Sequence, residues 1–241
     1  MSKQYETGHA KNVANLQKLI EQVTVYTSYN PPVENLTIAN LQTLYTTSLA
    51  KLDAVEEKRT ANKSAIHNRQ VAFENLKPLC TRIINHIEIL GLSEGTLDQA
   101  KSLNRLIQGG KKSTTTSREE NEEDINTVST SRQSYTQQAD NFGILLQLLS
   151  TITNYNPNLE ELKLENLTTY QASLMTVTQT VDQTEAELNA KFIERNNILY
   201  AEGTGLYSIA QNVKKYVKSI YGATSPEYSN VSKIKFNSRK V

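Results

Sequence analysis

Histidine and cysteine are the side chains best suited to acid–base, nucleophilic and metal chemistry, and the 241-residue sequence holds three histidines and one cysteine. His9 lies near the start of the chain. His67 and His86 stand in helical stretches without an acidic or histidine neighbour at metal-ligand spacing. No HExxH zinc motif and no glycine-rich phosphate loop occurs. The histidines are therefore interpreted as surface or structural residues.

Cys80 follows Leu79 in an apolar helical segment, which favours a buried and inert thiol. A single cysteine also excludes an intramolecular disulfide. These residues predict a non-enzymatic protein without metal or cofactor.

Basic residues gather in two segments, 100–113 and 205–241. The first holds no acidic residue, and the second sets seven basic residues against Glu227. Aromatic residues are interleaved with the second segment, and cations beside aromatic rings can hold phosphates and stack on bases. Nucleic-acid association through 100–113 and 212–240 is therefore the alternative function. The candidate anion or nucleic-acid contacts are Lys101, Arg105, Lys111, Lys112, Lys214, Lys215, Lys218, Lys233, Lys235, Arg239 and Lys240. The other interpretation is that lysines near helix ends offset the helix dipole.

Arg69 and Arg195 stand 126 positions apart, near the ends of two predicted long helices. They could form paired anion contacts across a pseudo-twofold axis. The favoured interpretation is structural, because a guanidinium group can cap helices or bridge carboxylates between them.

The same offset relates two copies of a fifteen-residue phrase, YNPPVENLTIANLQT at 29–43 and YNPNLEELKLENLTT at 155–169, which agree at eight positions. Pro31 and Pro157 restrict the asparagine before them to extended conformations, so a helix must end near the tyrosine of each copy. Each copy is predicted to mark the corner of one helical unit.

The elements around each corner are predicted from apolar residues at spacings of three and four. Such stripes precede both corners, and a long helix of roughly 35–40 residues follows each. A third helix is predicted at 77–91 and again at 205–222, each ending at a glycine. The segment after the first glycine is predicted to be helical, and 223–241 to be extended because of its proline and β-branched residues.

The predicted fold class is all-α: an internally duplicated, pseudo-twofold bundle of about six or seven long helices. The predicted division is a first repeat at 1–108, a flexible polar linker at 109–124 and a second repeat with a basic tail at 125–241. The amphipathic faces permit two separate three-helix bundles or one six-helix bundle. Polar residues also stand at positions of the first long helix that would otherwise face the core. They could face a second copy of the chain, so self-association is a further alternative.

Two basic segments, AKSLNRLIQGGKKS (100–113) and NVKKYVKSIYGATSPEYSNVSKIKF (212–236), together with the doubled YNP corner, resemble a family of uncharacterised, duplicated helical-bundle proteins from Bacteroidota. The resemblance implies a bacterial, cytoplasmic helical protein and carries no assigned activity. The N-terminus also lacks the apolar stretch of a secretory signal, and no apolar run approaches the ~20 residues that span a bilayer. Cytoplasmic localisation without membrane insertion is the expectation.

Long helices with polar outer faces supply surface rather than a reactive cleft. The sequence therefore predicts a non-enzymatic helical scaffold or protein-interaction protein, with a protein partner or self-association, and nucleic acid as the alternative partner.

Overall fold

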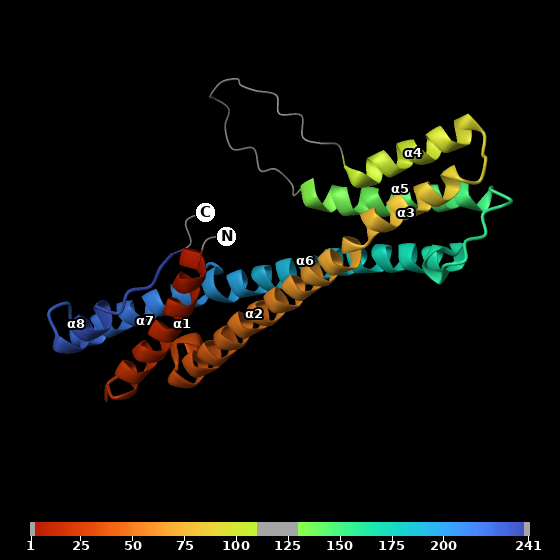
Figure 1. Cartoon of the computed structure of the whole chain (residues 1–241). Coiled ribbons are helices and arrows are strands. Elements are labelled where there is room, and N and C mark those ends of the chain that lie inside the picture. The colour runs from red at the N-terminus through yellow and green to blue at the C-terminus, as the bar shows by residue number, and fades with distance from the viewer. Residues whose placement is uncertain (1–2, 110–129, 239–241) are drawn as a thin grey trace, which may run out of the picture. The chain divides into compact units, whose positions relative to one another are not determined.

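The computed structural model describes residues 3–109 and 130–238 of the chain. In these ranges the regular elements are α-helices and two short 3₁₀ helices, without a strand, so the predicted all-α fold class is confirmed (Figure 1). The elements are α1 (Lys3–Thr24), η1 (Glu34–Leu36), α2 (Ile38–Glu74), α3 (Leu76–Glu88), α4 (Glu94–Gln108), α5 (Thr130–Ser150), η2 (Glu160–Leu162), α6 (Leu164–Tyr200), α7 (Leu206–Tyr221) and α8 (Pro226–Ser232).

The chain divides into two compact units. Unit 1 consists of Met1–Asn62 and Glu185–Val241, and unit 2 of Lys63–Thr184. Helices α2 and α6 contribute residues to both units. Each of the two predicted repeats, 1–108 and 125–241, therefore supplies part of unit 1 and part of unit 2. The duplication itself stays a prediction, although α2 and α6 are both 37 residues long and begin 126 positions apart.

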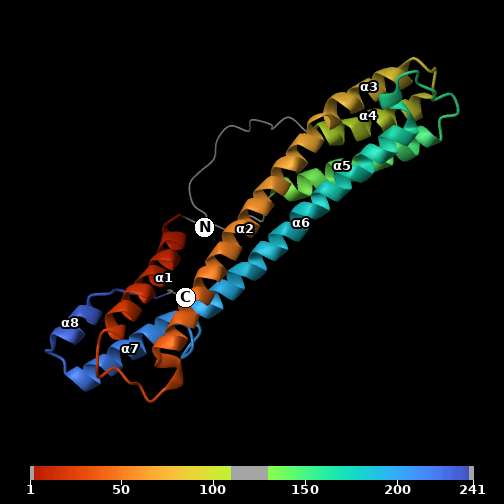
Figure 2. The ribbon, with the colours of Figure 1, turned by 90° about the horizontal axis from the view of Figure 1, so that it is seen from below.

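Unit 1 is built around the apolar faces of α1 and α7, with α8 beside them (Figure 2). Leu16, Leu19 and Val23 of α1 and Val213 and Val217 of α7 are all completely buried. Their spacing of three and four residues places them on one side of each helix. Full burial of one such side chain stabilises the fold by about 1.5–3 kcal/mol.

Unit 2 has a separate core between α3, α4 and α5, which lie side by side in Figure 1. Ile83 and Ile87 of α3, Ile107 of α4, and Phe142 and Leu145 of α5 have no exposed surface. These residues again repeat at helical spacing, as the sequence predicts.

The doubled phrase builds the same hydrogen-bonded corner in each unit. In unit 1 the Tyr29 hydroxyl donates to the Leu36 carbonyl oxygen at 2.7 Å, and the Asn40 side-chain amide donates to the Glu34 carbonyl oxygen at 2.7 Å. Helix α1 ends at Thr24, earlier than the predicted end near Tyr29, so the first bond ties the connection after α1 to η1. The second bond ties the start of α2 to η1. Burial raises the pKa of Tyr29, so its hydroxyl stays protonated and able to donate.

The corner of unit 2 repeats these contacts with the residues at the matching positions. The Tyr155 hydroxyl donates to the Leu162 carbonyl oxygen at 2.7 Å, and the Asn166 amide donates to the Glu160 carbonyl oxygen at 2.8 Å. Two of the eight identical positions of the phrase, the tyrosine and the second asparagine, therefore supply the side chains that close the corner.

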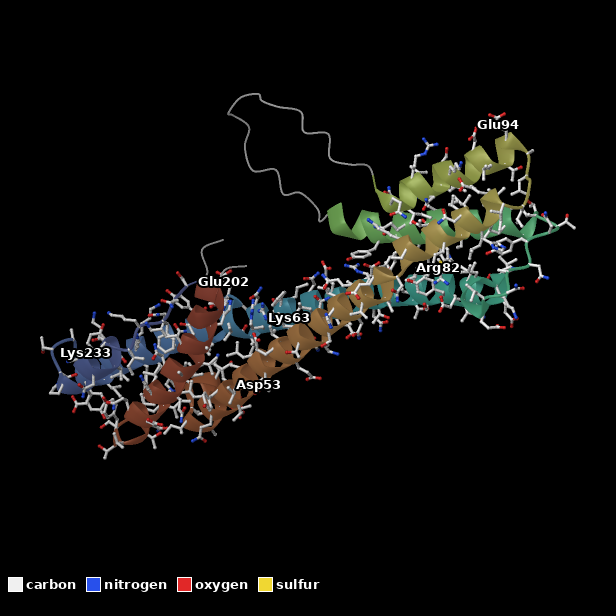
Figure 3. All side chains as sticks on the ribbon, viewed as in Figure 1. Asp53, Lys63, Arg82, Glu94, Glu202 and Lys233 are labelled. Atoms are coloured by element: carbon white, nitrogen blue, oxygen red, sulfur yellow. The ribbon has the colours of Figure 1, made fainter. Side chains whose placement is uncertain are left out.

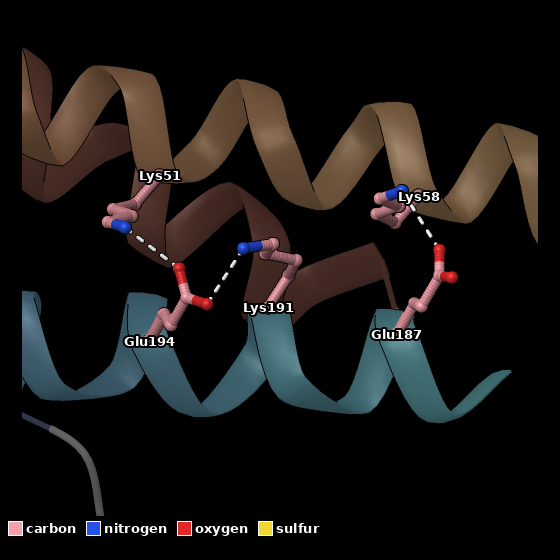
Figure 4. Close-up of polar contacts among 5 residues, drawn as sticks. All are labelled: Lys51, Lys58, Glu187, Lys191 and Glu194. Carbon is pink, nitrogen blue, oxygen red and sulfur yellow. Dashed lines mark hydrogen bonds and ion pairs between the residues drawn. The ribbon is translucent and has the colours of Figure 1, made fainter. Parts of the chain in front are cut away.

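Helices α2 and α6 run antiparallel in unit 1 and are joined by charged pairs (Figure 4). Glu194 accepts from Lys51 at 2.8 Å and from Lys191 at 2.7 Å, and Lys58 meets Glu187 at 2.9 Å. The pairs lie seven residues apart on each helix, which fixes the register of the two helices. Since these side chains are about one-third exposed and water screens their charges, the pairs add little to stability and act mainly on the register.

The segment after α7 differs from the prediction, because residues 226–232 form helix α8 and do not extend. The Ser225 hydroxyl accepts from the Tyr228 amide at 3.0 Å, and Pro226 occupies the first turn. Both features start a helix. Residues 235–238, which follow α8, have no regular secondary structure.

Two glycines hold positions that other residues would strain. Gly222 ends α7 with φ +92°, as predicted for a helix C-terminus. Gly205 lies in the break between α6 and α7, where a Cβ atom would come within 2.5 Å of the Ala201 nitrogen. The chain therefore leaves the helical conformation between α6 and α7, at residues 201–205.

Candidate functional site

A cleft of about 400 Å³ opens at the corner of unit 2, where the junction of α2 and α3 faces η2 and the start of α6. It is lined by Asn75, Pro78, Leu79, Arg82, Glu161, Asn166, Leu167 and Tyr170. The junction exists because Pro78 cannot donate a backbone hydrogen bond, which interrupts the helical ladder near Asn75.

The polar groups that line this cleft already bond within unit 2. The Arg82 guanidinium group meets the Glu161 carboxylate at 2.5 Å (Arg82 is labelled in Figure 3), and the Tyr170 hydroxyl donates to the Ala72 carbonyl oxygen at 2.6 Å. Burial raises the pKa of Tyr170 to about 12, which keeps this donor protonated.

The cleft has an apolar interior and a charged edge. Leu167 is 1% exposed, and Leu79 and Tyr170 are partly buried, whereas the side chains of Arg82 and Glu161 are 44% and 70% exposed. This arrangement offers shape, apolar contact and a pair of opposite charges to an incoming molecule.

The basic segment in unit 2 is partly engaged within its own unit. Lys101 pairs with Glu88 at 2.7 Å, and Arg105 is exposed on α4, where its guanidinium group donates to Ser102 one turn away. Lys111 and Lys112 lie outside the described residues.

The basic segment of unit 1 includes one lysine turned inward and four that are exposed. Lys214 donates to the Ile234 carbonyl oxygen, and burial lowers its pKa. The exposed members are Lys215, Lys218, Lys233 and Lys235, and Lys218 lies 5.6 Å from the centre of the Tyr228 ring. Arg239 and Lys240 fall outside the residues that the structure describes. The two basic segments belong to different units.

The two matching arginines are both buried. Arg69, in unit 2, is 3% exposed and lies 4.4 Å from the centre of the Tyr135 ring. Its Nε and Nη1 atoms have no hydrogen-bond partner among the described residues. A cation over an aromatic face is stabilised by the ring quadrupole, which gives Arg69 a packing role.

Arg195, in unit 1, is 2% exposed and lies 5.0 Å from the centre of the Phe192 ring. Its guanidinium group also donates to the Asn196 side-chain oxygen at 2.9 Å. Each arginine thus packs on an aromatic ring of its own unit.

His9, His86 and Cys80 lie among packed side chains, whereas His67 is exposed on α2. His9 shares a hydrogen bond of 2.7 Å with the Tyr200 hydroxyl, and His86 stands edge-on to Tyr155 with ring centres 5.5 Å apart. Cys80 is buried, and burial raises its pKa to about 12. Within the described part of the chain, no group of three or more acidic, histidine or cysteine side chains is placed to hold a metal ion.

Two residues with a clear structural role escape the sequence analysis. Asn12 is completely buried and Asn15 is 9% exposed, and both bind the backbone of the C-terminal segment. The available signal is their place in the apolar stripe of α1, beside Leu16 and Leu19, because a buried amide must be hydrogen-bonded.

Comparison with protein-family models, with curated protein sequences and with solved structures gives no match for this chain. Of the helices that the structure describes, none combines the length and the apolar character required to cross a membrane.

Proposed function

We propose that the chain is a non-enzymatic helical interaction protein that binds a segment of another protein in the cleft of unit 2. The observation that carries the proposal is the combination of partly accessible apolar side chains, Leu79 and Tyr170, with an exposed Arg82–Glu161 pair at the edge of the same cleft. Protein interfaces combine an apolar centre with a polar rim in the same way.

The hydrogen bonding of the cleft supports recognition over proton transfer. Tyr170 and Asn166 are committed to backbone carbonyl oxygens, and Arg82 and Glu161 to each other. A group poised for acid–base work needs a pKa near the working pH, whereas the pKa of Tyr170 is raised to about 12.

A second candidate, nucleic-acid association, is favoured by the exposed lysines of unit 1. Lys215 and Lys218 are exposed on α7, and Lys233 and Lys235 are exposed on the segment after α8. Such a cluster would contribute salt-dependent affinity for phosphates.

Two charge reversals test the proposal, because each replaces an exposed arginine of unit 2. Arg82→Glu places like charges at the cleft edge, whereas Arg105→Glu changes α4, away from the residues that line the cleft. Purified wild-type and variant chains are used to capture partners from bacterial lysate, with and without nuclease, at low and moderate salt.

Under the proposal, a defined protein is captured despite nuclease, is lost with Arg82→Glu and is retained with Arg105→Glu. Nucleic acid that is recovered at low salt and vanishes at moderate salt, with both arginine variants as with the wild-type chain, would instead favour the second candidate. Equal capture of one protein by both variants would overturn the cleft as the binding site.

A further inference from the structure

The C-terminal segment of unit 1 is bound by helix side chains as an extended peptide would be. Ile234 and Phe236 are partly buried against the core, whereas Lys235 and Asn237 are exposed. This alternation is the period of two that an extended backbone produces. Three side chains, Asn12 and Asn15 of α1 and Lys214 of α7, hold the backbone; together they are named the tail-binding surface.

Asn12 recognises both polar groups of one extended residue. Its Nδ2 atom donates to the Asn237 carbonyl oxygen at 2.8 Å, and its Oδ1 atom accepts from the Asn237 amide at 2.8 Å. One turn later, Asn15 donates to the Lys235 carbonyl oxygen at 2.7 Å. The segment therefore runs antiparallel to α1 and is held through backbone atoms that every amino acid except proline can provide.

The side-chain preference comes from two positions on the bound segment. Ile234 packs on the unit 1 core, and Phe236 does so two residues later. Lys214 donates to the Ile234 carbonyl oxygen while its Nζ atom lies 5.1 Å from the centre of the Phe236 ring. A cation at this distance favours an aromatic residue at the second position.

Space continues past the point where the segment turns away to join α8. A hollow of about 370 Å³ lies next to Ile234 and is bordered by Lys18, Glu21 and Gln22 of α1. A peptide without the connection to α8 could continue straight into this hollow, which has a cation and a carboxylate at its edge.

We propose that the tail-binding surface is a site for extended peptide segments of a partner protein, with an aliphatic residue followed two positions later by an aromatic residue. Residues 233–238 of the chain occupy this site in cis and compete with the partner. A tethered segment acts at an effective concentration of about millimolar, so the partner binds only by outcompeting it. This site lies in unit 1 and does not depend on the cleft of unit 2.

The test uses the full chain and a labelled peptide of residues 232–238, SKIKFNS. The double variant Ile234→Ser, Phe236→Ser removes both apolar anchors of the tethered segment and is expected to bind the peptide at least tenfold more tightly than the wild-type chain by fluorescence anisotropy. Adding Asn12→Ala to this variant is expected to weaken binding at least tenfold. Adding Lys11→Ala, at an exposed neighbour on α1, should leave the affinity unchanged.

A second measurement serves if the double variant loses its helical circular dichroism. In the wild-type chain, excess peptide should accelerate hydrogen exchange at the Asn237 amide, and a peptide with serine in place of phenylalanine should not. A folded double variant that binds the peptide no better than wild type overturns the proposal. If the variant does not fold, unchanged exchange at Asn237 overturns it.

Discussion

Replacing Tyr29 by phenylalanine removes one hydroxyl group and leaves the Leu36 carbonyl oxygen without its side-chain donor. Because Tyr29 is only 8% exposed, water cannot readily take the place of the hydroxyl. A hydrogen bond contributes about 0.5–1.5 kcal/mol net, and a buried group left unpaired costs about 1–3 kcal/mol. We expect Tyr29→Phe to lower the free energy of unfolding by about 1–2 kcal/mol.

The same change in the other corner provides an internal comparison. Tyr155→Phe removes a bond of equal length, 2.7 Å, from a less buried site, so we expect a loss near the lower end of that range. The matched control is Tyr45→Phe, whose hydroxyl bonds to Gln17 at 3.0 Å in an exposed setting. Its effect should stay within about 0.5 kcal/mol.

Denaturant titration followed by circular dichroism gives the free energies, and hydrogen exchange shows where each variant is weakened. Tyr29→Phe should reduce the protection of α1, in unit 1, and Tyr155→Phe that of α5, in unit 2. If both corner variants cost no more than Tyr45→Phe, the corner hydrogen bond does not explain why tyrosine stands in both copies of the phrase.

Three further predictions concern the charged pairs of Glu194, the Cys80 thiol and the division of the chain into units. Hydrogen bonds from Lys191 and Lys51 lower the pKa of Glu194 to about 2, so the stability that these contacts add is present above the ordinary value of 4.5 and lost as pH falls toward 2. In unfolding titrations from pH 6 to 2, Glu194→Gln should therefore lose less stability than the wild-type chain. An equal loss would contradict the assignment. The Cys80 thiol, with its pKa raised to about 12 by burial, should resist a thiol reagent at pH 8 until denaturant is added, and rapid labelling of the folded chain would refute its burial. Co-expressed fragments 1–109 and 130–241 should co-purify, because each unit combines parts of both fragments, whereas separately folded, non-associating fragments would contradict the division into units.

The corners and the helix faces could be predicted because their causes are local. Pro31 and Pro157 predict a break before each long helix, although α1 and α5 end at Thr24 and Ser150, earlier than the predicted ends near Tyr29 and Tyr155. Apolar spacing identifies buried side chains such as Leu19 and Phe142. The hydrogen bonds of Tyr29 and Asn40 explain the repeated residues, although the repeat alone could not name their acceptors.

The prediction that residues 223–241 are extended is wrong for helix α8, although the local sequence holds a signal for a helix start. Ser225, Pro226 and Glu227 form a standard helix start, with a capping hydroxyl, a proline in the first turn and an acidic residue near the positive end of the helix dipole. The β-branched residues that follow favour an extended backbone. Burial of Val231 against the unit 1 core outweighs that preference, as tertiary packing commonly does.

The contacts of Asn12 and Asn15 with the C-terminal segment could not be predicted, because the partners of both residues lie more than 200 positions away. Asn12 and Asn237 are 225 positions apart, and nothing in the local sequence of either residue specifies the other. The charge of Lys214 makes it a candidate phosphate contact in the sequence. In the fold, its ammonium group donates a hydrogen bond to the Ile234 carbonyl oxygen. Charge alone does not show which lysines of a basic segment remain accessible.

Each unit is built from elements of both halves of the chain. Unit 1 combines the corner of the first copy with α7 and α8, which follow the second copy, and unit 2 combines the corner of the second copy with α3 and α4, which follow the first. Tyr29 accordingly packs edge-on against Tyr216, and Tyr155 against His86. Each corner is completed by helices from the other half of the chain, so neither half alone holds a complete core. Two chains that each carried one copy could form the same units by exchanging these helices, as in domain swapping, which is a low-cost route to dimers. Joining the halves in one chain makes that exchange intramolecular and independent of concentration.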